Sequence, residues 1–61
     1  MKYFNVYQLK CLNNVHLYKD VQGCHYYIYR GDELMGTDSW EDEAVRKFNE
    51  VIIYGRIQVN Y

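Results

Sequence analysis

The sequence predicts a small α+β protein in which one antiparallel sheet packs on one helix and is completed by homodimerisation. Three observations lead to this prediction. Residues 3–30 alternate between two side-chain faces and are interrupted by turn-forming residues. Residues 38–49 then repeat apolar side chains at a helical spacing, and residues 51–61 return to a period of two. The predicted order of elements is therefore β-β-β-α-β within a single domain, residues 1–61.

The first two strands are predicted on either side of an asparagine pair. Residues 3–12 alternate side chains along their length, although neither face is purely polar. Asn13 and Asn14 predict a turn because asparagine tolerates positive φ better than most residues do. Residues 15–19 form the short second strand, and residues 20–23 form a hairpin loop.

The third strand, residues 24–30, is the strongest strand prediction because it is rich in aromatic and β-branched side chains. Alternation directs Tyr26 and Ile28 to one face, and Tyr27 and Tyr29 to the other.

The chain after this strand is predicted to turn and then to begin a helix. Gly31 breaks the strand. Residues 33–37 are predicted either to form a short strand or to be irregular, and Gly36 disfavours the strand. Asp38 or Ser39 is expected to cap the helix. With Asp38 as the cap, Glu41 is at the third helical position and could complete a capping box. The apolar stripe of the predicted helix consists of Trp40, Ala44 and Phe48.

The helix is expected to end near Asn49, before a C-terminal strand over residues 51–61. Gly55 interrupts the apolar face of that strand and predicts a bulge or a close backbone approach.

Acidic residues concentrate around the start of the predicted helix. Residues 31–43 contain no Lys or Arg, and all seven basic residues lie outside this range. The only tryptophan, Trp40, lies within it. Acids at a helix N-terminus stabilise the helix dipole, which explains part of the pattern. Spaced anions around a large aromatic side chain are also what a protein needs to bind the nucleic-acid-binding surface of another protein. The six carboxylates in this range are Asp32, Glu33, Asp38, Glu41, Asp42 and Glu43.

The length of the chain favours a partner. A domain of this size buries only about 60% of the surface that its unfolded chain exposes. Eight tyrosines, two phenylalanines and one tryptophan are a heavy aromatic load, and such side chains are enriched at interfaces. We therefore expect a homodimer. The sequence shows no signal peptide and no membrane span, so we expect a cytoplasmic protein without a membrane partner.

Metal binding and catalysis are disfavoured. Cys11, His16, Cys24 and His25 could suggest zinc, but Cys24 and His25 are adjacent and would point to opposite faces of a strand. A Cys–His dyad would lack an identifiable orienting group, and so short a chain has little room for a cleft. We expect no metal, no cofactor and no enzymatic activity.

Direct nucleic-acid binding is also disfavoured. The tyrosine-rich strand could stack bases, but a stacking platform needs flanking positive charge. Arg30 is the only nearby cation, six acids follow it, and the formal charge of the chain is −1. A core or dimer seam is the preferred interpretation of the tyrosines.

Several short motifs follow one another along the chain from about residue 23 to residue 59. A glycine-led turn precedes a doubled tyrosine and a third tyrosine, and a further glycine follows at Gly31. An acid introduces an aromatic–acid pair, Trp40–Glu41, and Glu50 precedes a β-branched segment that leads to Arg56. In this order the chain resembles the short, dimeric class of phage-encoded uracil-DNA glycosylase inhibitor. It departs from that family at residues 13–19, which would be an insertion, and at Trp40 and Ala44, where the family usually has phenylalanine and an aromatic residue, respectively.

The resemblance implies a mechanism. Dimers of that family enclose an apolar pocket, which takes the side chain that the glycosylase would insert into the DNA minor groove. Here it implies a pocket formed by Trp40 of both copies with Tyr26 or Tyr27 behind it, while Glu41, assisted by Asp42 and beside Asp38, replaces a DNA phosphate. The expected partner is uracil-DNA glycosylase, in the host cytoplasm if the protein is phage-encoded. The alternatives are another small phage-type anti-defence or adaptor protein that binds a host DNA-processing or defence enzyme, and a nucleic-acid-binding module.

Overall fold

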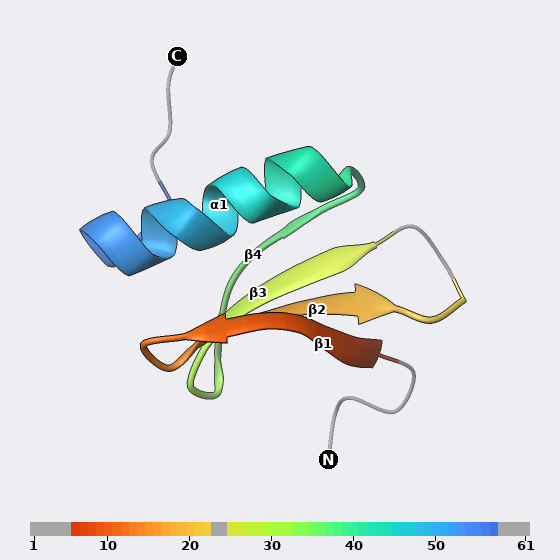
Figure 1. Ribbon diagram of the computed structural model, residues 1–61, viewed down its shortest axis with the longest axis horizontal. Coiled ribbons are helices and arrows are strands. Elements are labelled where there is room, and N and C mark those ends of the chain that lie inside the picture. Colours follow the sequence, from red (N-terminus) through yellow and green to blue (C-terminus); the bar gives the residue numbers. More distant parts are fainter. Residues whose placement is uncertain (1–5, 23–24, 58–61) are drawn as a thin grey trace.

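The computed structural model describes residues 6–22 and 25–57 and has two layers (Figure 1). One layer is a four-stranded antiparallel sheet in the order β1-β2-β3-β4, and the other is a single helix that lies across one face of it. The elements are β1 (Val6–Leu12), β2 (Val15–Asp20), β3 (Tyr26–Arg30), β4 (Glu33–Asp38) and α1 (Glu41–Tyr54). The predicted α+β class, an antiparallel sheet packed on one helix, is confirmed. The homodimer stays a prediction because the structure describes a single chain.

Two tight turns at one end of the sheet use the residues that the sequence offers for them. Asn13 and Asn14 join β1 to β2 with φ values of 54° and 64°, so the predicted asparagine turn is confirmed. Gly31 begins the β3–β4 turn with a φ of 59°, and its N–H donates to the carbonyl of Asn14 over 2.9 Å. The short strand predicted before the helix is present as β4. The end of the Ile57 side chain packs on Gly36, so a Cβ at this position would require that side chain to move.

The C-terminal strand is a wrong prediction. Residues 51–54 continue α1, residues 55–57 are not a strand, and residues 58–61 lie outside the described part of the chain. The helix also passes the expected end at Asn49, because Val51 falls on the same buried face as the preceding apolar residues. It ends at Gly55, which takes a left-handed φ of 77° and donates its N–H to the carbonyl of Val51 over 2.8 Å.

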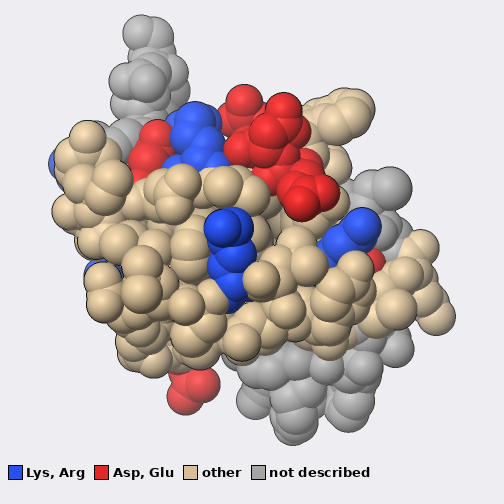
Figure 2. Space-filling model, viewed as in Figure 1, with Lys and Arg blue, Asp and Glu red and all other residues tan. Residues whose placement is uncertain are grey.

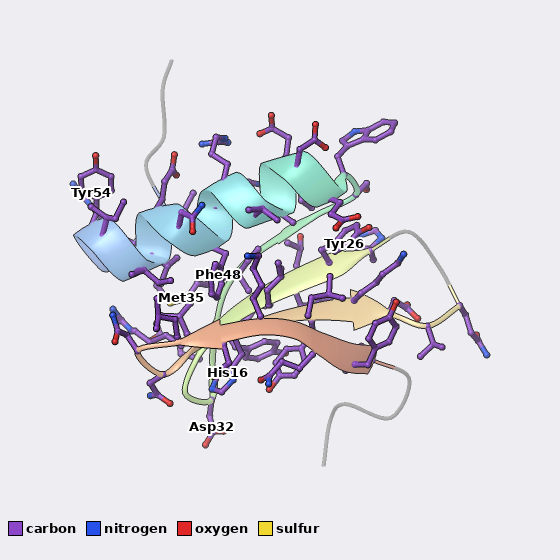
Figure 3. All side chains as sticks on the ribbon, in the orientation of Figure 1. His16, Tyr26, Asp32, Met35, Phe48 and Tyr54 are labelled. Atoms are coloured by element: carbon purple, nitrogen blue, oxygen red, sulfur yellow. The ribbon has the colours of Figure 1, made fainter. Side chains whose placement is uncertain are left out.

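The core lies between α1 and strands β2 and β3. Buried side chains alternate along both strands as the sequence predicted, with Tyr26 and Ile28 on the face that α1 covers. Among the described residues, the buried core consists of Val15, Leu17, Tyr26, Ile28, Ala44, Phe48 and Val51. Met35, Val45, Ile52 and Ile57 are partly buried against it. The edge strand β1 contributes none of these side chains, and the other face of the sheet points away from the helix (Figure 3).

Arg30 ties the end of β3 to the end of α1. Its Nη1 donates to the carbonyl of Gly55 over 2.8 Å, which satisfies one of the carbonyls left unpaired at a helix C-terminus. Within the described ranges, the helix is neither long nor apolar enough to cross a membrane.

We predict that Phe48→Ala removes most of the folded population. Phe48 is 3% exposed at the centre of the core, and truncating a buried phenylalanine typically costs about 3–5 kcal/mol. That loss is comparable to the whole stability of a small domain. Urea denaturation followed by circular dichroism measures it, with Ile53→Ala as the control because Ile53 is 69% exposed on the same helix. Equal losses in the two variants would contradict the assigned core.

Candidate protein-binding surface at the start of the helix

The connection between β4 and α1 is a two-residue bend, Ser39 and Trp40. Trp40 is the N-cap, with extended backbone angles of φ −118° and ψ 135°, and no side chain makes the usual capping hydrogen bond. Asp38 Oδ1 instead accepts a hydrogen bond from the N–H of Trp40 over 3.0 Å. The prediction that Asp38 or Ser39 caps the helix is therefore wrong, and Glu41 begins the helix rather than completing a capping box.

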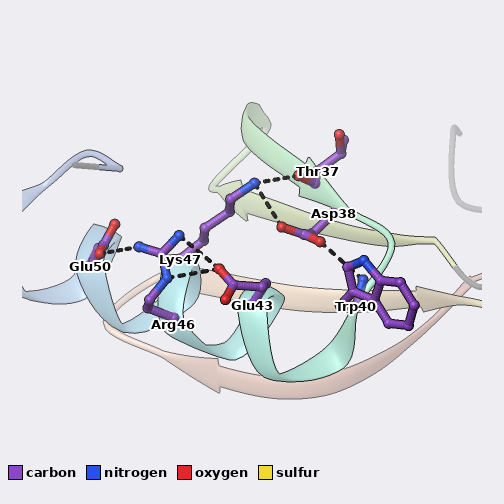
Figure 4. A network of polar contacts seen from close by, with 7 residues as sticks. All are labelled: Thr37, Asp38, Trp40, Glu43, Arg46, Lys47 and Glu50. Carbon is purple, nitrogen blue, oxygen red and sulfur yellow. Dashed lines mark hydrogen bonds and ion pairs between the residues drawn. The ribbon is translucent and has the colours of Figure 1, made fainter. Parts of the chain in front are cut away.

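Asp38 and Lys47 fasten the end of β4 to the middle of α1 (Figure 4). Lys47 Nζ lies 2.9 Å from Asp38 Oδ2 and donates to the carbonyl of Thr37 over 2.9 Å. The hydrogen bond from Lys47, with a second from the Trp40 N–H, holds the pKa of Asp38 below its ordinary value. Both side chains are largely shielded, with 13% of Asp38 and 23% of Lys47 exposed, so this ion pair is screened less than one at the open surface.

The indole of Trp40 lies in solvent. Ala44 and Phe48 are buried, as the predicted apolar stripe requires, but Trp40 is 70% exposed and does not belong to that stripe. The physical reason is the extended backbone of the N-cap, which takes Trp40 off the helical spiral. Figure 4 shows the ring directed away from the polar contacts around Asp38.

Two carboxylates of the first helical turn line an open depression. The first turn of α1 consists of the acidic residues Glu41, Asp42 and Glu43, all exposed. Figure 2 shows red atoms gathered over this half of the helix. Glu41 and Asp42, together with the apolar Val45, line the depression. Neither Glu41 nor Asp42 forms an ion pair with another residue in the described part of the chain.

Other acids near the helix are neutralised. Arg46 lies 2.9 Å from Glu43 and 2.5 Å from Glu50, and both contacts support its charged form, which raises the pKa of Arg46. The negative field at the helix start therefore comes mainly from Glu41 and Asp42.

The acidic window of the sequence is divided in space. Asp32 and Glu33 lie at the β3–β4 turn, at the opposite end of β4 from the helix start, and Figure 3 shows Asp32 on the far side of the sheet from α1. Glu33 also lies 3.5 Å from a guanidinium nitrogen of Arg30. Two of the six carboxylates are therefore remote from Trp40.

The two tyrosines expected behind Trp40 point to opposite faces of the sheet. Tyr26 pairs with Asp38 across β3 and β4 and is 5% exposed beneath the helix, so it supports the helix start from below. Tyr27 pairs with Thr37 on the other face. The structure thus brings Trp40, Glu41, Asp42 and Asp38 together above Tyr26 and separates Tyr27 from them.

Sequence reasoning missed the Lys47 anchor and the contribution of Val45. Lys47 is nine positions from Asp38, and only the docking of α1 against β4 brings the two together. Val45 was detectable as an apolar residue beside the predicted stripe, at helical spacing from Ile52.

Comparison of this chain with protein families, curated proteins and solved structures gave no match. The residues that the structure covers include no cluster of three or more His, Cys, Asp or Glu side chains able to hold a metal ion. Cys11 and His16 are cross-strand neighbours, and Cys24 lies outside the described residues.

We predict that Asp38→Asn destabilises the fold in a pH-dependent manner. The folded-state pKa of Asp38 is lowered, so its contribution is present above the unfolded pKa of about 3.9 and is lost as pH falls through the folded pKa. Asparagine still accepts the Trp40 N–H but loses the ion pair, at a cost on the order of 1 kcal/mol near pH 7. Urea unfolding across this pH range measures the difference, which should shrink below pH ~4. The control is Asp32→Asn in the exposed turn, and a pH-independent loss in Asp38→Asn would contradict the assigned ion pair.

Proposed function

We propose that this protein binds another protein through the start of α1 and inhibits uracil-DNA glycosylase by mimicking DNA. The observation that carries the proposal is the 70% exposed indole of Trp40 next to two carboxylates that form no salt bridge among the described residues. Lys19 interacts with Glu41 only through its longer-range field. We call the surface formed by Trp40, Glu41, Asp42 and Val45 the Trp40 surface.

An exposed tryptophan supports a binding role. Water around a large apolar ring is unfavourable, so burial of the indole by a partner would be favourable. Tryptophan is also among the residues that contribute most to protein–protein binding when they become buried at an interface.

The charges beside the ring support DNA mimicry. An enzyme that extrudes a base from DNA presents cationic groups to phosphates and inserts side chains into the duplex. Glu41 and Asp42 offer negative charge to such a surface, and the depression that they line with Val45 offers an apolar contact for an inserted side chain. Opposite charges would also accelerate the encounter of the two proteins.

The same chemistry suits other enzymes that bind DNA. A host defence or DNA-processing enzyme with a cationic DNA-binding surface is the alternative partner, and the same variants would weaken its binding. Cleavage of a uracil-containing oligonucleotide by the glycosylase, with and without the purified protein, distinguishes the two. Undiminished cleavage at excess protein would reject the glycosylase as the target.

We predict that Trp40→Ala weakens inhibition strongly while the chain stays folded. Loss of a hot-spot side chain costs about 2 kcal/mol or more, which corresponds to roughly 30-fold weaker binding. The inhibition constant measures it, and circular dichroism verifies the fold. Tyr54→Ala is the matched control because Tyr54 is also an exposed aromatic residue, 59% exposed at the other end of α1. Equal inhibition by Trp40→Ala and the original chain would contradict the proposal.

We predict that neutralising the two carboxylates weakens binding in a salt-dependent manner. The double variant Glu41→Gln and Asp42→Asn should bind roughly tenfold more weakly at low salt, and the difference should shrink as salt screens the original charges. The matched control is the double variant Glu33→Gln and Asp32→Asn, which also removes two negative charges, but at the far end of β4. If both double variants lose affinity equally, net charge rather than the Trp40 surface governs binding.

A further inference from the structure

We propose that the face of the sheet turned away from α1 is a protein interface on which a second copy of this chain packs, sheet against sheet. This face is far from the Trp40 surface, and the inference does not depend on the proposed function.

The strand register defines the residues of this face, because residues directly opposite each other in an antiparallel pair share one face. Tyr29 is opposite both His16 and Leu34, and Tyr27 is opposite both Tyr18 and Thr37. β1 adds a residue to each row. The centre of the open face therefore consists of two rows, one of Cys11, His16, Tyr29 and Leu34, and the other of Gln8, Tyr18, Tyr27 and Thr37. The pair Val6 and Asp20 continues the face at one end, and Asp32 in the β3–β4 turn lies at the other.

Aromatic rings form a layer over the two central strands. His16 stacks on Tyr18 with ring centroids 5.8 Å apart and an interplanar angle of 14°, and Tyr18 meets Tyr29 edge to face at 5.8 Å. His25 meets Tyr27 at 5.9 Å. Figure 3 shows His16 on the side of the sheet opposite α1. The ring layer is rigid and presents a large contact area at low entropic cost.

The composition of the open face is that of an interface. None of the eight side chains in the two central rows is Lys, Arg, Asp or Glu, although a quarter of the chain is charged. The carboxylates of Asp20 and Asp32 lie at the two ends of the face. A sheet face that remains in water is usually polar, whereas the cores of protein interfaces are depleted in charge and enriched in tyrosine. A nucleic acid is a poorer occupant, because stacked bases bring phosphates that need Lys or Arg beside the rings.

A second copy fits this face because the face is self-complementary. A two-fold axis would bring the uncharged central rows of the two copies together, with Asp20 and Asp32 at the rim of the contact. The core of a single chain has seven buried side chains in its described part, and small domains often require oligomerisation for stability. A second sheet about 10 Å away would bury the rings on their open side.

This arrangement leaves both helices on the outside of the dimer. Each copy would then present its own Trp40 surface, at a distance from the other. It differs from the arrangement implied by the family resemblance, in which Trp40 of both copies encloses one pocket. The two arrangements give different results in one experiment.

The experiment compares two leucine-to-lysine variants by sedimentation velocity over a concentration series. Leu34, on edge strand β4, belongs to the open face and is 50% exposed. Leu12, on edge strand β1, is opposite the core residue Val15 on the helix side of the sheet and is 55% exposed. The original chain should sediment as a dimer, twice the 7.4 kDa monomer. Leu34→Lys should raise the dimer dissociation constant at least about tenfold because it buries an unpaired charge in the contact between the sheets, and Leu12→Lys should leave it unchanged.

Three outcomes would overturn the proposal: a monomeric original chain, a larger effect of Leu12→Lys than of Leu34→Lys, and no effect of either. If Leu34→Lys fails to fold by circular dichroism, Thr37→Lys on the other row of the open face takes its place, and the same outcomes apply. If the original chain is monomeric, its binding to a fluorescent single-stranded oligonucleotide is measured next. Binding by the original chain that is lost in Leu34→Lys would assign the open face to nucleic acid instead.

Discussion

The packing of one helix on one face of a four-stranded sheet determines the rest of this structure. Ala44, Phe48 and Val51 form the buried side of α1 and meet the inward residues of β2 and β3. A helix with its side chains is about 10 Å wide, and strands lie about 4.8 Å apart, so one helix cannot cover both faces or the full width of such a sheet. The described part of the molecule consequently has one apolar core, an edge strand, β1, that adds no side chain to it, and one aromatic face without a helix over it.

The position of the helix also explains why Trp40 is exposed. Only Ser39 and Trp40 connect β4 to α1, and the Asp38–Lys47 pair holds the two elements together at this point. Because the short connection must reverse the chain in an extended conformation, the side chain at the N-cap points outward. The fold would be compatible with a small polar residue there, and N-caps usually have one. The presence of the largest apolar side chain at this position is what makes a binding role the better explanation.

The sequence predicted the elements whose patterns are strong and local. Alternation identified β2 and β3 and the inward direction of Tyr26 and Ile28, and the asparagine pair identified the first turn. It failed where local preference and tertiary packing disagree. The run from Val51 to Ile53 is β-branched and favours a strand, but Val51 lies three residues after Phe48 and completes the buried helical face. At the candidate site, the acidic first turn was predictable, whereas the separation of Asp32 from Trp40 required the path of β4.

The proposed function requires that Trp40 is exposed to solvent in the free protein and becomes buried when a partner binds. The fluorescence of Trp40, the sole tryptophan of the chain, tests this requirement most directly. In the free protein we expect emission typical of a hydrated indole and efficient quenching by acrylamide. Addition of uracil-DNA glycosylase should shift the emission to shorter wavelength and protect it from the quencher. A free protein whose tryptophan already resists quenching, or emission that stays unchanged when a bound complex has formed, would contradict the account.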